Sequence, residues 1–287
     1  MAASSYVPAP LRRLELLRRH VQLWKPFDAL GFVLGFVWQV LSSIPLTLRH
    51  YRSQVMLTLT DMTWGRGSVI VGGGTAAVMV VMGAAIGASI GIEAYSTLNM
   101  VALGQISGLV SAFANTRELA PIAAGVGFAA QAGCRMTAEI GSMRISEEID
   151  AIESLGIRSV PFVVTTRVIA AIVSIVPTFL IALILSYSAS ALIVTVLHGE
   201  PSGVYEHYFT DFLFGWDVLA AVIKVVVFAV AVILIHCYQG FFAYGGPEGV
   251  GIASGRAIRA SFVAIISLDM VLTLALWGFT SPVTFSG

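Results

Sequence analysis

The stretch VLAAVIKVVVFAVAVILI, residues 218–235, decides the fold. Its only charged residue is Lys224, and the remaining side chains are apolar. A run of about 20 apolar residues is long enough for a helix to cross the hydrocarbon core of a bilayer. Similar runs occur elsewhere in the chain, at 67–92, 94–116, 168–197 and 260–282, the last broken only by Asp269. The sequence therefore predicts an all-α integral membrane protein with several spans.

The composition supports this class. Of 287 residues, 57% are hydrophobic and 11% are charged, whereas a soluble domain carries about 25% charged residues. The formal net charge is zero, so the chain lacks the excess positive charge that favours a nucleic-acid partner. We expect the two cysteines, Cys134 and Cys237, to be buried thiols. Residues 1–20 lack the apolar core of a signal peptide, so we expect no removable leader.

Basic residues are unevenly distributed along the chain. The connections 93–99 and 199–217 contain no Lys or Arg, and neither does the tail that follows Asp269. Basic residues concentrate in cytoplasmic loops of membrane proteins. These three segments are therefore predicted to lie outside the cytoplasm, with a cytoplasmic N-terminus and an extracytoplasmic C-terminus.

The first long apolar segment, 27–48, has basic residues on both sides, at 12–25 and at 49–66. A single crossing would place one of these clusters outside. We therefore expect this segment, together with the amphipathic stretch 11–24, to lie in the cytoplasmic interface. An ordinary first transmembrane helix is the alternative. On this interpretation, residues 1–66 form N-terminal cytoplasmic and interfacial helices that precede a membrane domain at 67–287.

The region 94–134 is interrupted only by Arg117 and Glu118. Two crossings here would move the following basic connection outside, so charge favours one long span with a kink near Pro121, which lacks a backbone N–H. The sequence thus predicts an N-terminal interfacial helix and five transmembrane helices. Their expected ranges are about 68–93, 99–134, 160–197, 217–242 and 258–281.

Glycines at a four-residue spacing mark one helix face in the first span. Gly83, Gly87 and Gly91 align there, and a second helix backbone can approach closely along such a stripe. Packing within one chain is the favoured interpretation. A subunit interface or a moving joint is the alternative.

Ionisable residues within apolar spans are energetically costly and usually face a partner or a cavity. We expect Glu118 and Lys224 to form a pair or to share a polar cavity, with Arg117 beside them. Unrelated local hydrogen bonding is the alternative. For Arg167 and Asp269, a position near the bilayer surface is favoured.

Signals for chemistry are weak. The five histidines do not have the spacing of a metal motif, so we expect no metal site and no catalytic residue. The glycine-rich stretch 244–255 has the frame of a phosphate-binding loop but lacks its Lys and Ser or Thr. We expect a flexible cytoplasmic loop there, before the last span. An intramembrane enzyme or a passive channel is the competing class of function.

The connection after the second span contains a short acidic segment, 146–157. Ser146 suits a helix N-cap and Gly156 a C-terminal stop. The expected helix is too short to span and carries acidic residues on its polar face, whereas helices that rest on a bilayer usually carry Lys or Arg there. Docking into a groove of a cytoplasmic protein is therefore favoured over resting on the bilayer. The residues expected to make this contact are Glu147, Glu148, Ile149, Asp150, Ala151, Ile152, Leu155 and Gly156.

Two stretches resemble the MlaE/YrbE family of ABC transporter permeases. The first is RELAPIAAGVGFAAQAGCRMTAEIGSMRISEEIDAIESLGIRSVPFVVTTRVIA, residues 117–170, and the second is KVVVFAVAVILIHCYQGFFAYGGPEGVGIASGRAIRAS, residues 224–261. The resemblance covers about residues 30–280. At 130–135 the chain reads AQAGCR where many members read AGR followed by a glycine. This variant is most similar to a B-type YrbE subunit of a mycobacterial Mce lipid transporter.

The resemblance implies a function and a set of partners. It implies a permease dimer clasped by a dimer of cytoplasmic ABC ATPases, which bind ATP and Mg²⁺, whereas this chain binds no cofactor. The segment 146–157 would be the coupling helix, and Arg117, Glu118 and Lys224 would lie along the lipid path. The variant at 130–135 favours a heterodimer with an A-type YrbE subunit, and extracytoplasmic Mce proteins would carry the lipid. Candidate lipids are fatty acids, mycolic acids, phospholipids and sterols.

Overall fold

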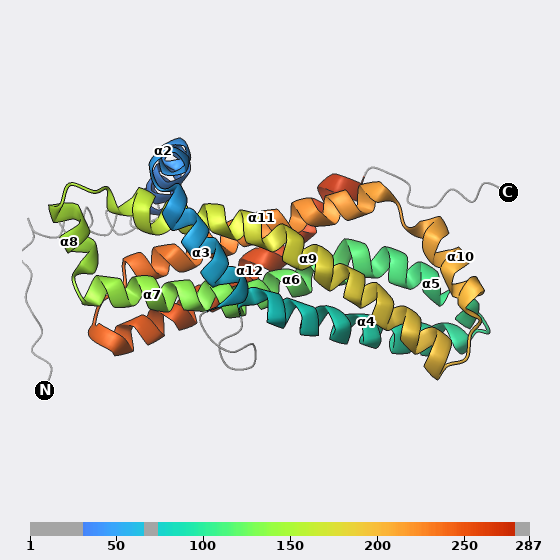
Figure 1. The fold of residues 1–287 in the computed structure, drawn as a ribbon. Helices are drawn as coiled ribbons and strands as arrows, with labels where there is room; N and C mark the ends of the chain where they lie inside the picture. The colour runs from blue at the N-terminus through green and yellow to red at the C-terminus, as the bar shows by residue number, and fades with distance from the viewer. Residues whose placement is uncertain (1–30, 66–73, 279–287) are drawn as a thin grey trace, which may run out of the picture.

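The computed structural model describes residues 31–65 and 74–278, and over these ranges every regular element is a helix. Figure 1 shows an elongated bundle with α8 at one end and α10 at the other. The N-terminal elements are Gly31–Ser42, α2 (Ile44–His50) and α3 (Arg52–Trp64), followed by α4 (Thr75–Asn99). The central elements are η1 (Gly104–Ile106), α5 (Ser107–Val110), η2 (Ser111–Leu119), α6 (Ala120–Phe128), η3 (Ala129–Gly133), α7 (Cys134–Ile145) and α8 (Glu148–Ser154). The last elements are η4 (Val160–Thr165), α9 (Thr166–Leu192), η5 (Ile193–Leu197), α10 (Ser202–Phe212), α11 (Gly215–Phe241) and α12 (Gly246–Trp277).

Four of the described helices are long and apolar enough to cross a membrane: Thr75–Asn99, Val160–Leu197, Gly215–Phe241 and Gly246–Trp277. A fifth candidate is the pair Gly31–Ser42 and Ile44–His50, which is bent by 40°. In Figure 1 these N-terminal helices are seen almost end-on beside the bundle, whereas α4, α9 and α11 run along its length. The structure confirms an all-α membrane protein with several spans. The stretch 11–24 lies outside the described residues.

The predicted second span, 99–134, is a chain of short helical pieces. It begins at Gly104, and two of its pieces, η2 and η3, are π-helical. The pieces run in line along the bundle in Figure 1. The helix continues past the predicted end of the span at 134, through α7 to Ile145. The irregularity expected near Pro121 is present, since η2 ends two residues before it and Pro121 lies in the first turn of α6.

The expected cytoplasmic loop at 244–255 is wrong. Helix α12 already begins at Gly246, with Pro247 in its first turn. The N–H groups of a first turn have no partner within the helix, so the missing N–H of proline costs no hydrogen bond there. A Cβ on Gly249 would lie 1.7 Å from the Tyr244 carbonyl oxygen. A Cβ on Gly141 would lie 2.7 Å from the Val250 side chain, so the α7–α12 contact also needs a glycine. Gly141 and Gly249 therefore allow the start of α12 to pack closely against its neighbours.

The acidic segment forms the short helix α8, but its predicted N-cap is wrong. Ser146 instead caps the preceding helix, and its hydroxyl donates to the Ser142 carbonyl at 2.9 Å. Glu147 precedes α8 in a left-handed conformation, with φ of 60°. Gly156, with φ of 77°, lies just after the helix, as a C-terminal glycine is expected to.

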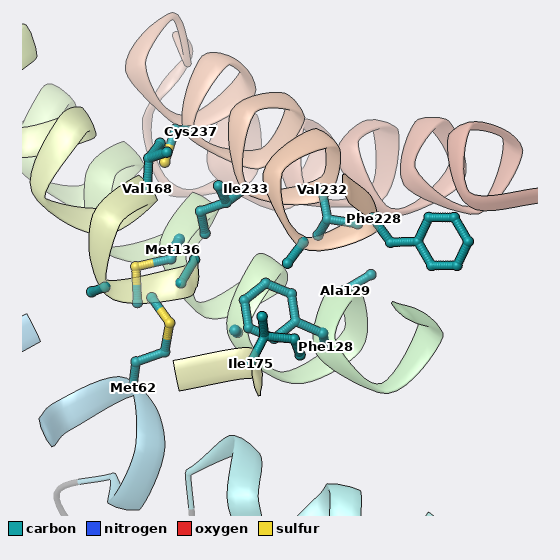
Figure 2. Packing of buried hydrophobic residues seen from close by; sticks show 14 of the residues in the cluster. Met62, Phe128, Ala129, Met136, Val168, Ile175, Phe228, Val232, Ile233 and Cys237 are labelled. Atoms are coloured by element: carbon teal, nitrogen blue, oxygen red, sulfur yellow. The ribbon is translucent and has the colours of Figure 1, made fainter. Parts of the chain in front are cut away.

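Buried apolar side chains from α3, α6, α7, α9 and α11 form one core (Figure 2). Met62 of α3 points toward Met136 of α7, and Phe128 of α6 lies beside Ile175 of α9. Val168 of α9 and Cys237 of α11 meet further along the bundle. The helix α3 thus shares the core of the long spans, although it precedes the predicted domain boundary at 67.

The glycine stripe of α4 lies directly against α9. A Cβ on Gly83 would lie 2.3 Å from the Ala182 carbonyl oxygen, and one on Gly87 would lie 1.9 Å from that of Ser186. A Cβ on Gly91 would lie 2.9 Å from the Cβ of Ile193. These contacts are made within one chain, as the favoured interpretation expects. Because the opposing atoms at Gly83 and Gly87 are backbone, neither position has room for a side chain.

Replacing Gly87 by alanine should therefore separate α4 from α9 and destabilise the protein by about 1–3 kcal/mol, the usual range for overpacking. The measurement is thermal unfolding of the purified protein in detergent. Gly251→Ala is the matched control, because it also adds one methyl group within a helix but meets nothing within 4 Å. Equal unfolding temperatures for the two variants would contradict the α4–α9 contact.

Candidate functional site

A proline in the second span frees a carbonyl group for a side chain. Pro121 has no N–H, so it cannot donate a helical hydrogen bond to the carbonyl of Arg117 four residues earlier. Lys224 of α11 supplies a donor, with 2.7 Å between its Nζ and the Arg117 carbonyl oxygen. The π-helical segment η2 contains both Arg117 and Glu118. The local break in the helix therefore brings the Lys224 ammonium together with the charged residues Arg117 and Glu118.

Lys224 is fully buried, and its ammonium is surrounded by oxygen atoms. Nζ lies 2.6 Å from Oδ1 of Asp269 and 3.3 Å from Oε2 of Glu118. It also donates to Oγ1 of Thr273 at 2.9 Å, and this hydroxyl donates to Oε1 of Glu118 at 2.9 Å. Buried charges are stable only when paired and hydrogen-bonded. These contacts meet that condition for Lys224.

Arg117 has its own partners next to Lys224. Its Nη2 donates to Oδ2 of Asp217 at 2.9 Å, and only 2% of the Asp217 side chain is exposed. The guanidinium lies 3.8 Å from the ring centroid of Phe113 and 5.1 Å from that of Trp277. The Trp277 indole N–H donates to the other oxygen of Asp217 at 2.9 Å. Below, the charge cluster means Arg117, Glu118, Asp217, Lys224 and Asp269.

A pocket of about 320 Å³ opens beside the charge cluster. Most of its lining is apolar, and the side chain of Glu118 is 36% exposed. Lys224, by contrast, is fully covered. The pocket therefore combines apolar walls with one accessible carboxyl group. Its lining residues are Phe113, Ala114, Arg117, Glu118, Thr273, Leu274, Trp277 and Gly278.

The three residues singled out from the sequence, Arg117, Glu118 and Lys224, lie together in this cluster. The sequence favours a position near the bilayer surface for Asp269, but the structure buries it against Lys224. The sequence did not single out Asp217, which is the third residue of α11 and directly precedes an apolar run. No sequence signal identifies Thr273 or Trp277, because neither is unusual in an apolar helix.

A second ionic network links α3, α7 and α9. Arg135 donates to Oδ2 of Asp61 at 2.5 Å and to Oε1 of Glu139 at 2.8 Å. Arg167 lies 3.4 Å from Oε2 of Glu139 and donates to the Val163 carbonyl at 2.6 Å. Arg167 is thus tied into the bundle by several contacts, and the network holds three helices together near α8.

The helix α8 presents a largely exposed acidic surface at one end of the bundle. Ile149 is fully buried and belongs to the core, and Ile152 packs partly against it. Leu155 is 77% exposed. Asp150 accepts a hydrogen bond from Arg144 of α7 at 2.7 Å, and Glu153 accepts one from Ser159, which precedes η4. The other predicted contact residues, Glu147, Glu148, Ala151 and Gly156, are exposed.

Within residues 31–65 and 74–278, no three His, Cys, Asp or Glu side chains lie close enough together to hold a metal ion. The described carboxylates of the charge cluster are instead paired with Arg117 and Lys224. The arrangement is therefore that of a buried ionic lock beside an apolar pocket.

Replacing Lys224 by methionine should destabilise the protein by about 3–5 kcal/mol, because Glu118 and Asp269 would lose their shared cation. The measurement is thermal unfolding in detergent, with Arg259→Met, an exposed change on α12, as the control. Adding Asp269→Asn to Lys224→Met should recover part of the loss. Unfolding of Lys224→Met at the wild-type temperature would rule out a stabilising role for the ion pairs.

Comparisons with known proteins identify a family and several related proteins. The family model "Permease MlaE" matches residues 64–275. A chloroplast protein of Arabidopsis thaliana, TRIGALACTOSYLDIACYLGLYCEROL 1, is 29% identical over 66% of this chain and 54% of its own length. A probable ABC transporter permease of Rickettsia bellii is 29% identical over 65% of this chain and 72% of its own length. The intermembrane phospholipid transport system permease protein MlaE of Haemophilus influenzae is 26% identical over 70% and 77%.

The family model covers both the charge cluster and α8, so the match includes the two features that the structure brings out. A permease of an ABC transporter is a transport component without catalytic activity, and it works with an ATPase. The chain belongs to the MlaE family of ABC transporter permeases and is a multi-pass membrane protein.

Proposed function

We propose that this permease moves a hydrophobic lipid across or out of the plasma membrane in a transporter of the Mce/Mla type. The observation that carries the proposal is the pocket beside the charge cluster, which offers apolar walls to a lipid chain and a carboxyl group at its edge. The Haemophilus influenzae relative is named as a phospholipid transport permease. Phospholipids, fatty acids, mycolic acids and sterols all have the apolar part that this pocket would accept.

In this proposal Arg117, Glu118 and Lys224 lie along the lipid path, with Lys224 covered behind the pocket wall. Arg117 is held in place by Asp217 and the two aromatic rings, and Lys224 is held by four oxygen atoms. Groups with fixed positions do not have to reorganise when a ligand enters. Glu118 is the exposed member, so it would contact the passing lipid or its water.

The helix α8 would couple ATP hydrolysis to transport. Its exposed residues, Glu147, Glu148 and Leu155, form an acidic surface around one apolar side chain, suited to a groove on the ATPase. Its buried residue, Ile149, anchors it in the core. Hydrogen bonds from Arg144 and Ser159 tie α8 to the elements before and after it. A push on α8 would therefore move α7 and α9 with it.

The same helix chain leads from α8 to the pocket. Helix α7 continues through η3 and α6 into η2, which contains Arg117 and Glu118. Closure of the ATPase dimer would thus displace the pocket wall formed by η2 relative to α12. The π-helical segments are the expected places for this change, because π-bulges are common at functional sites in helices.

The membrane orientation follows from charge. The α10 end, opposite α8 in Figure 1, contains Glu93, Glu200, Glu206 and Asp211 but no Lys or Arg between 199 and 217. The α8 end contains Arg144 and Arg158. We therefore infer that α8 is cytoplasmic and α10 extracytoplasmic. The bend between Gly31–Ser42 and α2 supports an interfacial N-terminal helix rather than a straight span.

For the remaining partners, the sequence AQAGCR at 130–135 supports a B-type YrbE subunit that pairs with an A-type homologue. Extracytoplasmic Mce proteins would then bind at the α10 end and carry the lipid. The apolar surface of α12 remains exposed in the single chain, with Val263, Ile266 and Met270 each more than half exposed. Contact with the second permease subunit or with lipid would cover it.

Reversing the charges of Glu147, Glu148 and Asp150 to lysine should abolish co-purification of the ATPase and lipid transport, since the acidic surface of α8 would become basic. The measurement is affinity purification of the complex, followed by uptake of a labelled lipid in cells. Reversal of Glu206 and Asp211, exposed acidic residues of α10, is the matched control for ATPase binding. Normal ATPase recovery with the α8 variant would refute the coupling role.

A further inference from the structure

The charge cluster contains more negative than positive groups. Arg117 and Lys224 supply two cations, whereas Glu118, Asp217 and Asp269 supply three carboxyl groups. All five side chains are buried except that of Glu118, which is 36% exposed. An uncompensated charge at membrane depth costs several kcal/mol or more. One further positive charge is therefore needed to make the cluster neutral.

The cluster divides into two parts, and the excess negative charge belongs to one of them. Arg117 and Asp217 form a one-to-one ion pair that is closed by the Trp277 indole N–H. Lys224 is shared by Glu118 and Asp269, at 3.3 Å and 2.6 Å from its Nζ. Two carboxylates therefore depend on one ammonium group.

The carboxyl groups of Glu118 and Asp269 both lie against the Lys224 ammonium, so they are close to each other inside the bundle. Two ionised carboxylates at such a site repel each other and one ammonium group balances only one of them, so a proton on one of the two is needed. The Thr273 hydroxyl cannot supply it, because its single hydrogen already points to Oε1 of Glu118. The three hydrogens of the Lys224 ammonium are donated to the Arg117 carbonyl, Oε2 of Glu118 and Oγ1 of Thr273, and its contact with Asp269 is an ion pair.

We propose that Glu118 and Asp269 form a proton-binding site, in which the two carboxyl groups share one proton beneath the Lys224 ammonium. With this proton the pair carries a single negative charge, which Lys224 balances. The other charged groups that face the pair, Arg117 and Asp217, balance each other. Tyr187 of α9 is a further titratable group next to η2, and its hydroxyl contacts Thr116 at 2.5 Å.

The proton exchanges with the outside through Glu118. Asp269 and Lys224 are covered, at 11% and 0% side-chain exposure, whereas Glu118 forms part of the pocket wall. The protonated pair thus gives the pocket a less charged wall, and loss of the proton to water leaves an extra negative charge there. Only this consequence for an apolar ligand depends on the proposed lipid transport; the proton site itself depends on the geometry alone.

Infrared difference spectroscopy of the purified complex in lipid nanodiscs tests the site directly. The wild-type protein at neutral pH should show a carbonyl band of a neutral carboxylic acid that is lost on raising the pH while the protein stays folded. The band should be absent in Glu118→Gln and in Asp269→Asn. Glu139→Gln, which changes a carboxyl group of the other ionic network, should retain it.

Absence of the band from the folded wild-type protein, or its persistence in both variants, would overturn the proposal. The wild-type titration needs no substitution, so a variant that fails to fold does not remove the test. A bound metal cation is the other source of the missing positive charge. Thermal unfolding of the protein is therefore compared in sodium, potassium and choline chloride. Stabilisation by one alkali cation, with no acid band, would mean that a metal cation and not a proton occupies the site. Neither measurement requires transport, so a failure of the proton site can be distinguished from a failure of the proposed transport function.

Discussion

Burial of the Lys224 ammonium inside an apolar bundle is the constraint on which the rest of the site depends. An isolated ammonium group could not remain charged there, and the chain meets the requirement with contacts from two other helical elements, η2 and α12. Pro121 leaves the Arg117 carbonyl without its helical donor, and Lys224 takes that place. Glu118 comes from the same π-helical segment, and Asp269 and Thr273 come from α12. The interaction thus links η2, α11 and α12.

The parts of the bundle around this cluster differ in how they can move. The glycine stripe presses α4 onto the α9 backbone, and the network of Asp61, Arg135, Glu139 and Arg167 joins α3, α7 and α9. These helices form a closely packed unit that also holds α8. The pocket lies instead between η2 and α12. A force applied at α8 would accordingly be transmitted through the rigid helices and would act on the pocket wall.

The membrane class, the expected pair of Glu118 and Lys224 and the acidic α8 follow from the sequence because each depends on a local pattern: an apolar run, a charge within it, or a short amphipathic segment. The detailed geometry does not. The pairing of Asp217 with Arg117 joins residues a hundred positions apart. The helical start of α12 depends on the packing of Gly141 of α7 against Val250, which is a tertiary contact that overrides the low helix propensity of the glycines in this segment. The left-handed Glu147 likewise reflects the turn between α7 and α8 and gives no sequence signal.

The account centres on the pocket beside the charge cluster as part of a lipid path. Site-specific photo-crosslinking tests this most directly, with a photoreactive amino acid at Leu274 in the pocket or at Ile184 on the exposed surface of α9. The permease would be assembled with its ATPase in membranes that contain a radiolabelled lipid. The account predicts labelling at Leu274 that changes when ATP is added, and labelling at Ile184 by the surrounding bilayer that does not. Labelling at Leu274 that is independent of ATP, as at Ile184, would contradict it.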